Sequence, residues 1–502
     1  MLEKLFYKIE HGQDVRGSLI TMREILKGEN GRRAVRELQP DKVSLLTGLL
    51  ESDDPKTRRA AAYILGENRI QDAARAIFRT YQKEETLFIR ADLLRALSGL
   101  NYRFCMADLQ QIFEEKKEES QAGSAGSSAK HLAAEIKALR DMLMDAAPAR
   151  RHHFTGWNVD STVILLTSAG LEQLTFDQLS PEQQERAGIV RGGVRVHSER
   201  LQDLMQIRTV KGMLFRICAN PLPDNSPEAA AQTLINSNLQ DFIACRHSGT
   251  GPYYFRIDLR TKLFLTERSR YIARLAAAIE RRSAFVLQNS ASDYEFEIRL
   301  TEGRSGRYSV YLQINTIPDD RFSYRRNAPS VSMHPVKAAE MISLAEPWLD
   351  KDAIVLDPMC GTGTLLIERR KRLQARSLYG VDSYGEMVRM GRENARAAGV
   401  MANFINRDFH DFSHEYSFDE IITELPAVGT NRTLQDLAVL YQDFIRRVPV
   451  WMGGKGILAV CAPQADIFQR AADAAPALTL LLQQKLSGKR GDQLFVYQYT
   501  RK

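Results

Sequence analysis

The chain has 502 residues, more than one hydrophobic core usually serves, so we expect two to four domains. Its composition, 44% hydrophobic and 26% charged residues, excludes collagen-like, low-complexity and strongly disordered classes of protein. Residues 150–330 carry +5 of the net charge of +7, from 24 Lys and Arg against 19 Asp and Glu, which fits either a phosphate-bearing partner or a solvated surface.

The chain shows neither a targeting segment nor a metal-ligand spacing. No apolar run approaches the ~20 residues that span a bilayer. The first residues, MLEKLFYKIEHGQDV, mix charged with apolar side chains and lack the apolar stretch of a signal peptide. The five cysteines are scattered without CxxC spacing, which argues against a zinc site or any other metal centre and predicts a reducing, cytoplasmic compartment.

Residues 1–119 are helical in pattern and contain two similar stretches, DPKTRRAAAYILGEN and ETLFIRADLLRALSGLN. In each, a polar turn and an arginine precede a small, apolar helical face that ends in glycine. Arg58 and Arg90 lie 32 residues apart, a period typical of stacked helix pairs. The region resembles HEAT-like repeats, which would offer a surface to a protein partner. An ordinary helical bundle remains the alternative.

Residues 120–153 are predicted to connect the helical region to the rest. SQAGSAGSSAKH, residues 120–131, has small and polar side chains without apolar periodicity and reads as a flexible linker. A short amphipathic helix, AAEIKALRDMLMD, follows and should end at Pro148.

Residues 154–325 have an α+β pattern. Strands are predicted in VDSTVILL, GGVRVHSE, MLFRI, GPYYFRIDL, YEFEIRLTE and RYSVYLQINT, and a long helix in SRYIARLAAAIERRSAFVL. The strands alternate apolar and polar residues, as in a sheet with one wet face.

Residues 326–502 alternate strand and helix, so we expect a multidomain α/β protein whose last domain has the α/β pattern. AIVLD, SLYGVD, NFINRD, DEIIT and GILAVCA read as strands separated by helices. That order predicts a doubly wound, mostly parallel sheet of Rossmann-like type. The last two strands, around LTLLLQQKL and QLFVYQY, are joined by a short loop and should be antiparallel.

The strongest pattern is VLDPMCGTGTLLIE, in which a strand ends in Asp357 and a glycine-rich turn opens a helix. Gly361 and Gly363 permit positive φ and close approach of a ligand to the backbone. Asp382 ends the next strand, where a carboxylate can accept hydrogen bonds from ribose hydroxyls, and Asp408 ends the third, within reach of an adenine amine. The spacing is not G-x-G-x-x-G, so the acids fit an adenosine without phosphates, namely S-adenosylmethionine. A dinucleotide site or a purely structural turn is the alternative.

D-P-M-C-G-T-G-T-L-L-I-E resembles the first motif of class I RNA methyltransferases that carry a THUMP domain. GVDSYGEMVRMGRENARAAGV is similar to that family's second-strand segment, and ILLTSAGLEQL and LMQIRTV to its THUMP region. The resemblance covers about 155–502 and implies a cofactor role for Pro358 and Thr364 as well. RFSYRRNAPSVSMHPVKAAEM resembles the family's segment before the methyltransferase domain, which implies RNA contacts for Arg321, Tyr324, Arg325 and Lys337.

The turn in DEIITELPAVG is where the family resemblance is weakest. The family has Asn or Asp, one residue, Pro and an aromatic there; this chain has Glu424, Pro426 and Ala427. In the family, a side-chain oxygen and a backbone carbonyl accept the N–H groups of a guanine N2 amine and aim its lone pair at the methyl group, so catalysis is mostly positioning. Glu424 keeps an acceptor oxygen but adds ~1.5 Å of reach, and Ala427 loses a stacking contact worth roughly 1–3 kcal/mol.

The resemblance therefore implies N2-methylation of a guanosine in tRNA or rRNA, with Glu424 and Pro426 at the target amine. The alternatives are a catalytically degenerate methyltransferase fold that binds RNA, an assembly factor and, more remotely, a DNA adenine methyltransferase. Cys360 and Cys461 are expected to pack in the core, so covalent chemistry through a thiolate is not expected. His334 would lie at the cofactor edge or on the surface.

Overall fold

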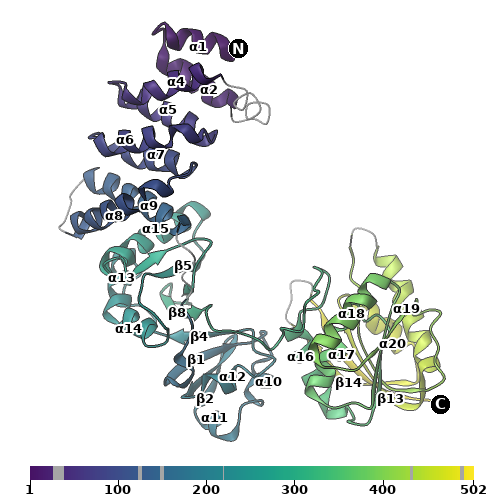
Figure 1. Cartoon of the computed structure of the whole chain (residues 1–502). Helices are drawn as coiled ribbons and strands as arrows, with labels where there is room; N and C mark the ends of the chain where they lie inside the picture. The colour runs from purple at the N-terminus through teal and green to yellow at the C-terminus, as the bar shows by residue number, and fades with distance from the viewer. Residues whose placement is uncertain are drawn as a thin grey trace. The chain divides into compact units, whose positions relative to one another are not determined.

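A computed structural model describes residues 1–26, 39–121, 127–146, 152–218, 220–429, 433–486 and 491–501 (Figure 1). The chain divides into two compact units. The first comprises Met1–Arg151 with Ala277–Gln288, and the second His152–Ala276 with Asn289–Lys502. Among the described helices, none combines the length and the apolar character needed to cross a membrane.

The first unit is a stack of helices, in which α5 packs against α2 and α7, and α7 packs against α9. Asp54 begins α5, because its carboxylate accepts hydrogen bonds from the backbone N–H groups of Lys56 and Thr57. The helices are α1 Leu2–Glu10, α2 Val15–Leu26, α4 Pro40–Gly48, α5 Pro55–Glu67, α6 Ala74–Lys83, α7 Leu87–Ser98, α8 Met106–Gln121 and α9 Ser127–Ala146 (Figure 1).

The glycine that closes each of the two similar stretches has a packing role. A Cβ atom at Gly66 would lie 2.3 Å from the carbonyl oxygen of Ala96, and one at Gly99 would lie 2.7 Å from the carbonyl oxygen of Gly66. Only glycine allows this approach between α5 and the end of α7. The resemblance between the two stretches thus accompanies direct contact between them.

The predicted linker is mostly helical where the structure describes it. Residues 120–121 belong to α8 and residues 127–131 to α9, while residues 122–126 lie outside the described part. α9 contains the predicted amphipathic helix and buries Leu132, Ile136 and Leu139 in the same core as the preceding helices. It is therefore part of the first unit and not a free connection.

The long helix predicted in the middle region is α15, Leu265–Arg282, and it ends earlier than predicted. Ala284 and Phe285 have φ of +48° and +60°, which break the helix, and the strand β6, Leu287–Asn289, follows. Residues 277–288 cluster with the first unit: Phe285 lies in its core, and Glu280 pairs with Arg140. The predicted domain bounds, 1–119 and 154–325, did not assign residues 277–288 to the first unit.

The second unit contains an eight-stranded sheet of order β2-β3-β1-β4-β8-β7-β5-β6. Its recorded pairings are antiparallel except for the parallel pair β5 and β7. Buried and partly exposed residues alternate along β1, β5 and β8, as predicted for a sheet with one solvent-exposed face. The strands are β1 Ser161–Leu166, β2 Ala187–Val190, β3 Gly193–Ser198, β4 Gly212–Arg216, β5 Tyr253–Arg260, β7 Phe296–Glu302 and β8 Tyr308–Ile314; the helices are α10 Glu172–Phe176, α11 Pro181–Glu185, α12 Leu201–Leu204, α13 Pro227–Asn236 and α14 Leu239–Ala244.

The other sheet of this unit has the order β11-β10-β9-β12-β13-β15-β14. The first five strands are parallel, and β15 is antiparallel to both of its neighbours. The predicted doubly wound, mostly parallel sheet is thereby confirmed, and its last two strands, β14 and β15, are antiparallel to each other as predicted. The elements are α16 Pro335–Ala345, β9 Ile354–Asp357, α17 Thr364–Arg372, β10 Ser377–Asp382, α18 Gly385–Ala398, β11 Asn403–Asn406, β12 Phe418–Glu424, α19 Leu434–Trp451, β13 Met452–Ala462, α20 Ala465–Asp473, β14 Leu478–Lys485 and β15 Gln493–Thr500.

Two apolar cores flank this parallel sheet. One contains residues of α16, α17 and α18, and the other contains residues of α19 and α20. The carboxyl ends of β9, β10, β11 and β12 therefore meet at one edge, with the glycine-rich turn among them. The predicted boundary at residues 325 and 326 falls inside the second unit.

Candidate active site

The turn after β9 presents open backbone at the edge of the sheet. Gly361 and Gly363 have φ of +51° and +76°. A Cβ atom at Gly363 would lie 2.7 Å from the ring of Phe404, whereas one at Gly361 would have no atom within 4 Å. Gly363 is therefore needed for packing, and Gly361 faces space in which a ligand can approach the backbone.

Asp382 connects this turn to the next strand. Its Oδ2 accepts a hydrogen bond from the backbone N–H of Gly361 at 2.9 Å, and its Oδ1 accepts one from Tyr384 at 2.9 Å. A carboxylate has about four acceptor positions, so Asp382 retains capacity for ribose hydroxyls. The partly exposed side chain lies beside the open face of Gly361.

Asp408 lies two residues beyond β11 and is exposed. Its carboxylate accepts hydrogen bonds from the backbone N–H and the ring nitrogen Nδ1 of His410, and these bonds lower the pKa of Asp408 despite the opposing effect of desolvation. The group is an ionised acceptor at neutral pH, as a contact to an adenine amine requires.

Asp357 lies beneath the turn and is 1% exposed. Its carboxyl group accepts hydrogen bonds from the Thr423 hydroxyl at 2.8 Å and the Met359 backbone at 3.3 Å. Burial raises the pKa of Asp357 to about 7, and the negative charges of Asp382 and Glu424 act in the same direction. Asp357 thus joins the turn to β12, and any effect on a cofactor would pass through the turn. Pro358 and Thr364, at the two ends of the turn, are also buried.

The segment before α16 is fastened to the same turn by Asn394, a fully buried residue of α18. The Asn394 side chain accepts from the backbone of Asn327 at 3.0 Å and donates to the carbonyl oxygen of Thr362 at 3.3 Å. Ser332 and Thr362 also share a hydrogen bond of 3.2 Å. Sequence reasoning did not single out these residues as site residues, although Asn394 is the asparagine of the segment that resembles the family.

All four residues predicted to contact RNA have polar atoms engaged within the protein. Arg321 pairs with Asp319 at 2.7 Å and donates to the carbonyl oxygen of Ile207. The Tyr324 hydroxyl donates to Glu368 at 2.6 Å, and its ring is 4% exposed. These contacts favour a structural role over direct contact with RNA. Arg325 donates to the Met333 carbonyl at 3.3 Å and is partly exposed.

Lys337 is the fourth residue predicted to contact RNA, and its side chain reaches the end of β12 beside the ELP turn. From α16, its ammonium donates to Glu424 Oε1 at 2.7 Å and to Asp492, whose side chain is 10% exposed. Burial disfavours the ammonium, but the carboxylates of Glu424 and Asp492 outweigh burial and raise the pKa of Lys337 above its ordinary value. Lys337 is thus a permanently charged anchor for Glu424.

The rest of the ELP turn continues the strand pairing. The Leu425 N–H donates to the Cys461 carbonyl at 2.9 Å, and the Pro426 carbonyl accepts from the Tyr441 hydroxyl at 2.7 Å. A carbonyl oxygen has a second lone pair, so Pro426 can accept one further donor. Backbone contacts thus fix the position of Glu424 at the carboxyl edge of the sheet.

The two cysteines near the site are buried. Burial raises the pKa of Cys360 well above its ordinary value and that of Cys461 to about 12. Both thiols therefore stay protonated, in line with their expected packing role. Glu424, Cys461 and Asp492 have ligand atoms within 4.8 Å of one another, but the Lys337 ammonium already binds both carboxylates and supplies the charge that a metal ion would bring.

His334 caps α16. Its Nδ1 accepts from the Val336 backbone at 3.3 Å, and burial together with Arg325 and Lys211 lowers the pKa of His334. The ring is therefore neutral at physiological pH and serves the helix start.

Comparison with known proteins identifies the domain that holds this edge. Residues 323–484 match the family described as the RMKL-like methyltransferase domain. These residues are a methyltransferase domain. A stretch of 102 residues is 34% identical to carboxy-S-adenosyl-L-methionine synthase of Nautilia profundicola and covers 20% of this chain and 40% of that protein. Another of 134 residues is 28% identical to tRNA (guanine(10)-N2)-dimethyltransferase of Methanothermobacter thermautotrophicus and covers 26% and 39%.

The chain thus spans about two fifths of the length of the curated relatives it matches. Among solved structures, TrmN from Thermus thermophilus aligns with a TM-score of 0.52 at 22% identity, over 67% of this chain and 99% of that one. SMU.472, whose crystal structure contains S-adenosylhomocysteine, aligns with a TM-score of 0.50 at 16% identity, over 68% of this chain and 98% of that one. These two structures share the fold.

The methyltransferase domain is of the kind that depends on S-adenosylmethionine, and this cofactor fits the residues present. Gly361 offers backbone that no side chain covers, and Asp382 and Asp408 offer acceptors beside it. The predicted enzyme class and cofactor are confirmed at the level of this domain.

Proposed function

We propose that this protein transfers a methyl group from S-adenosylmethionine to the N2 amine of a guanosine in tRNA or rRNA. The observation that carries the proposal is the Glu424 carboxylate, fixed by Lys337 at the carboxyl edge of β12 in the domain whose glycine turn fits the cofactor. The similarity to a tRNA guanine-N2 methyltransferase supports the choice of substrate.

In this proposal the protein acts mainly by positioning. S-adenosylmethionine supplies an electrophilic methyl group on a sulfonium. Glu424 accepts one N–H of the target amine and the Pro426 carbonyl accepts the other, so that the nitrogen lone pair faces the methyl group. The N–CH₃ bond forms as the S–CH₃ bond breaks, and the surplus proton of the amine passes through the Glu424 carboxylate to solvent.

Lys337 compensates for the added methylene of Glu424 by restraining the longer side chain. Because its ammonium holds Oε1, the longer side chain is kept in one orientation, and the side chain as a whole is 28% exposed. Among the described residues, no hydrogen bond is recorded to Oε2, which is the atom available to a substrate amine. We regard Lys337 as a positioning residue and not as an RNA contact.

The other regions enter the same proposal. We propose that residues 154–325 form a THUMP-like region that binds structured RNA, and that residues 1–119 form HEAT-like repeats. The sheet with one solvent-exposed face and the excess of arginine in residues 150–330 support the first assignment. The stacked α5 and α7, with equivalent glycines, support the second.

A binding protein without chemistry is the second candidate. It is favoured by Ala427 in place of an aromatic and by the ammonium that already occupies one oxygen of Glu424. Such a protein would bind RNA and cofactor but transfer nothing.

The test is methyl transfer from labelled S-adenosylmethionine to total RNA from cells that lack this gene, followed by digestion to nucleosides. We expect labelled N2-methylguanosine with the wild type and a loss of at least about 100-fold with Glu424→Ala, while cofactor binding by calorimetry is retained. Glu415→Ala, an exposed glutamate of the same domain, is the control. No label from a wild type that binds cofactor would favour the binding protein.

A further inference from the structure

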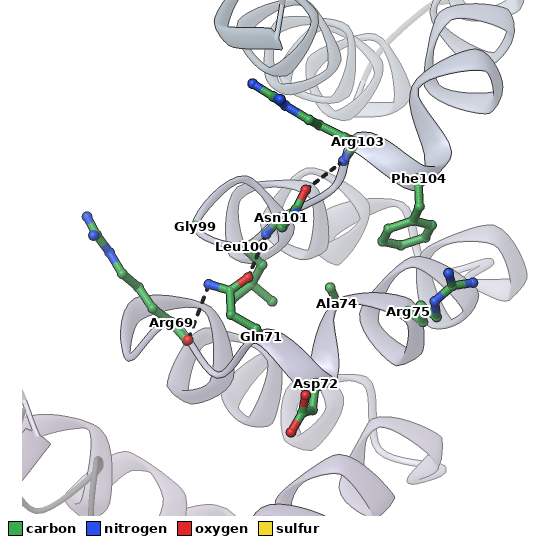
Figure 2. Close-up of a pocket in the computed structure, with 10 residues that line it drawn as sticks. All are labelled: Arg69, Gln71, Asp72, Ala74, Arg75, Gly99, Leu100, Asn101, Arg103 and Phe104. Carbon is green, nitrogen blue, oxygen red and sulfur yellow. Dashed lines mark hydrogen bonds between the residues drawn. The ribbon is translucent and has the colours of Figure 1, made fainter.

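A hollow of about 900 Å³ opens on the first unit, where the turn between α5 and α6 meets the turn between α7 and α8 (Figure 2). Three arginines, Arg69, Arg75 and Arg103, and the ring of Phe104 line it. We call this feature the arginine groove. It lies wholly within the first unit.

The two turns occupy corresponding positions in the two similar stretches of sequence, and polar contacts tie them together. Gln71 Oε1 accepts from the Asn101 backbone at 2.8 Å, and Asn101 Oδ1 accepts from the Arg103 backbone at 3.3 Å. Gln71 also donates to the Arg69 carbonyl at 3.4 Å (Figure 2). The groove is thus formed by stacked turns whose backbones are fixed before any ligand arrives.

The arginines of the groove differ from most others in this unit. Arg58, Arg90 and Arg95 are held by carboxylates at 2.7, 2.9 and 2.6 Å. In the part of the chain that the structure describes, no ion pair or side-chain hydrogen bond is recorded for the guanidinium groups of Arg69, Arg75 and Arg103, and all three side chains are exposed. Asp72 is the single acid among the lining residues, so the groove carries a net positive charge.

Phe104 adds an aromatic face to this charge. Phe104 is 42% exposed and lies in the short helical turn Arg103–Cys105 between α7 and α8. The Arg75 guanidinium lies 4.8 Å from the ring centroid. The Phe78 ring packs nearly perpendicular to the Phe104 ring, with 6.0 Å between the two ring centroids. The ring is therefore held in place while part of it stays open to solvent. Figure 2 shows the Phe104 ring beside the Arg75 side chain.

We propose that the arginine groove binds single-stranded RNA, with phosphates at the three guanidinium groups and one base stacked on Phe104. Unpaired arginines beside a fixed, exposed ring match the chemistry of a sugar-phosphate chain with bases, because each base has a face that can stack. An acidic peptide would use the arginines but not the ring. The choice of RNA rests in part on the proposed function, since the groove would bind a second segment of the RNA that is methylated.

The test uses the full-length protein, because α9 and Phe285 share the core of the first unit and truncation would expose them. Binding of a fluorescein-labelled 30-nucleotide oligouridylate is measured by anisotropy from 50 to 300 mM KCl. The test variant is Arg69→Ala/Arg75→Ala/Arg103→Ala. The matched control is Lys4→Ala/Lys8→Ala/Arg16→Ala, which removes three exposed cations of the same unit outside the groove. Circular dichroism verifies that both variants fold.

We expect the groove variant to bind at least about tenfold more weakly at 100 mM KCl, with a salt slope smaller by about 2, and the control to behave as wild type. Phe104→Ala should weaken binding roughly fivefold or more without changing the slope. Wild-type affinity and slope in the groove variant would overturn the proposal. So would a loss of binding confined to a labelled oligoglutamate peptide, which would assign the groove to an acidic protein partner.

Methyl transfer by the wild type is measured on the same preparations. Failure of the catalytic proposal would appear as no transfer, whereas failure of the groove proposal would appear as unchanged affinity for RNA. The two results are independent.

Discussion

At the scale of single residues, the network around Glu424 shows how one substitution changes what its neighbours must do. A glutamate in place of the shorter acid or amide brings a longer, more mobile side chain to the end of β12. Lys337 pairs both with Glu424 and with Asp492, so three residues from distant parts of the chain form a largely buried cluster. Two carboxylates and one ammonium leave a net negative charge, which a target amine with its N–H donors can offset.

Replacement of Lys337 by methionine should therefore destabilise the protein and impair positioning. Glu424 and Asp492 would be left close together without a partner, which costs about 3–5 kcal/mol of the free energy of unfolding. Urea denaturation measures this, with Lys351→Met, an exposed lysine of the same domain, as the control. The double variant Lys337→Met/Asp492→Asn should recover part of the loss. Equal stability of the single and double variants would argue against the network.

A pH effect on stability is expected from Asp357. Its pKa in the folded state is about 7, above the value of about 3.9 in an unfolded chain. Between these values the folded state keeps a proton that the unfolded state has released, so the free energy of unfolding falls as pH rises from about 4 to about 7.

Asp357→Asn removes this titration, and its stability should vary less between pH 5 and pH 7 than that of the wild type. The difference should be on the order of 2–4 kcal/mol and is measured by urea denaturation at the two pH values. Identical pH profiles for wild type and variant would show that Asp357 is ionised in the folded state.

At the scale of elements, the turn between β9 and α17 separates packing from binding. Its two glycines look alike in the sequence, yet Gly363 faces the Phe404 ring and Gly361 faces open space. Both have positive φ, so both disfavour a side chain.

We expect Gly363→Ala to lower mainly the stability of the protein and Gly361→Ala to lower mainly its affinity for the cofactor. Gly363→Ala meets the ring at 2.7 Å and should lower thermal stability by several degrees, since overpacking costs about 1–3 kcal/mol beyond the backbone strain. Gly361→Ala should unfold at a higher temperature than Gly363→Ala but bind S-adenosylmethionine more weakly. Calorimetric titration and thermal unfolding of both variants check this, and the reverse order would contradict the assignment.

At the scale of the whole molecule, Glu368 connects the two sheets of the second unit. Its carboxylate, with a fully buried side chain, accepts from Arg208 at 2.6 Å and from the Tyr324 hydroxyl at 2.6 Å. Arg208 lies before β4 of the mixed sheet, and Glu368 lies on α17 of the parallel sheet. This network joins residues on both sides of the predicted boundary at 325.

Glu368→Ala should accordingly destabilise the protein by about 3–5 kcal/mol, because Arg208 would remain partly buried without its counter-charge. Glu386→Ala, which breaks a solvent-exposed ion pair with Arg389, should change the free energy of unfolding far less than Glu368→Ala does. Urea denaturation of both variants gives the comparison. Equal effects would mean that the connection does not depend on this ion pair.

Periodicity and turn residues were enough to predict the succession of strands and helices along the parallel-sheet domain, the antiparallel pairing of its last two strands and the glycine turn. These features depend on neighbours in the sequence, since an apolar strand, a glycine pair and the following helix are adjacent along the chain. The predicted end of the helix α15 was wrong by several residues. Ala284 and Phe285 are residue types that helices accept, but both adopt positive φ in the segment that clusters with the first unit.

Only the tertiary structure decided which charged residues act together. Lys337, Glu424 and Asp492 are separated by 87 and 68 residues, and no local pattern marks them as partners. The same holds for Arg208 with Glu368, and for the burial of Arg321 and Tyr324 in contacts within the protein. A charge is exposed or paired according to what the fold places beside it, and that placement depends on contacts between distant segments.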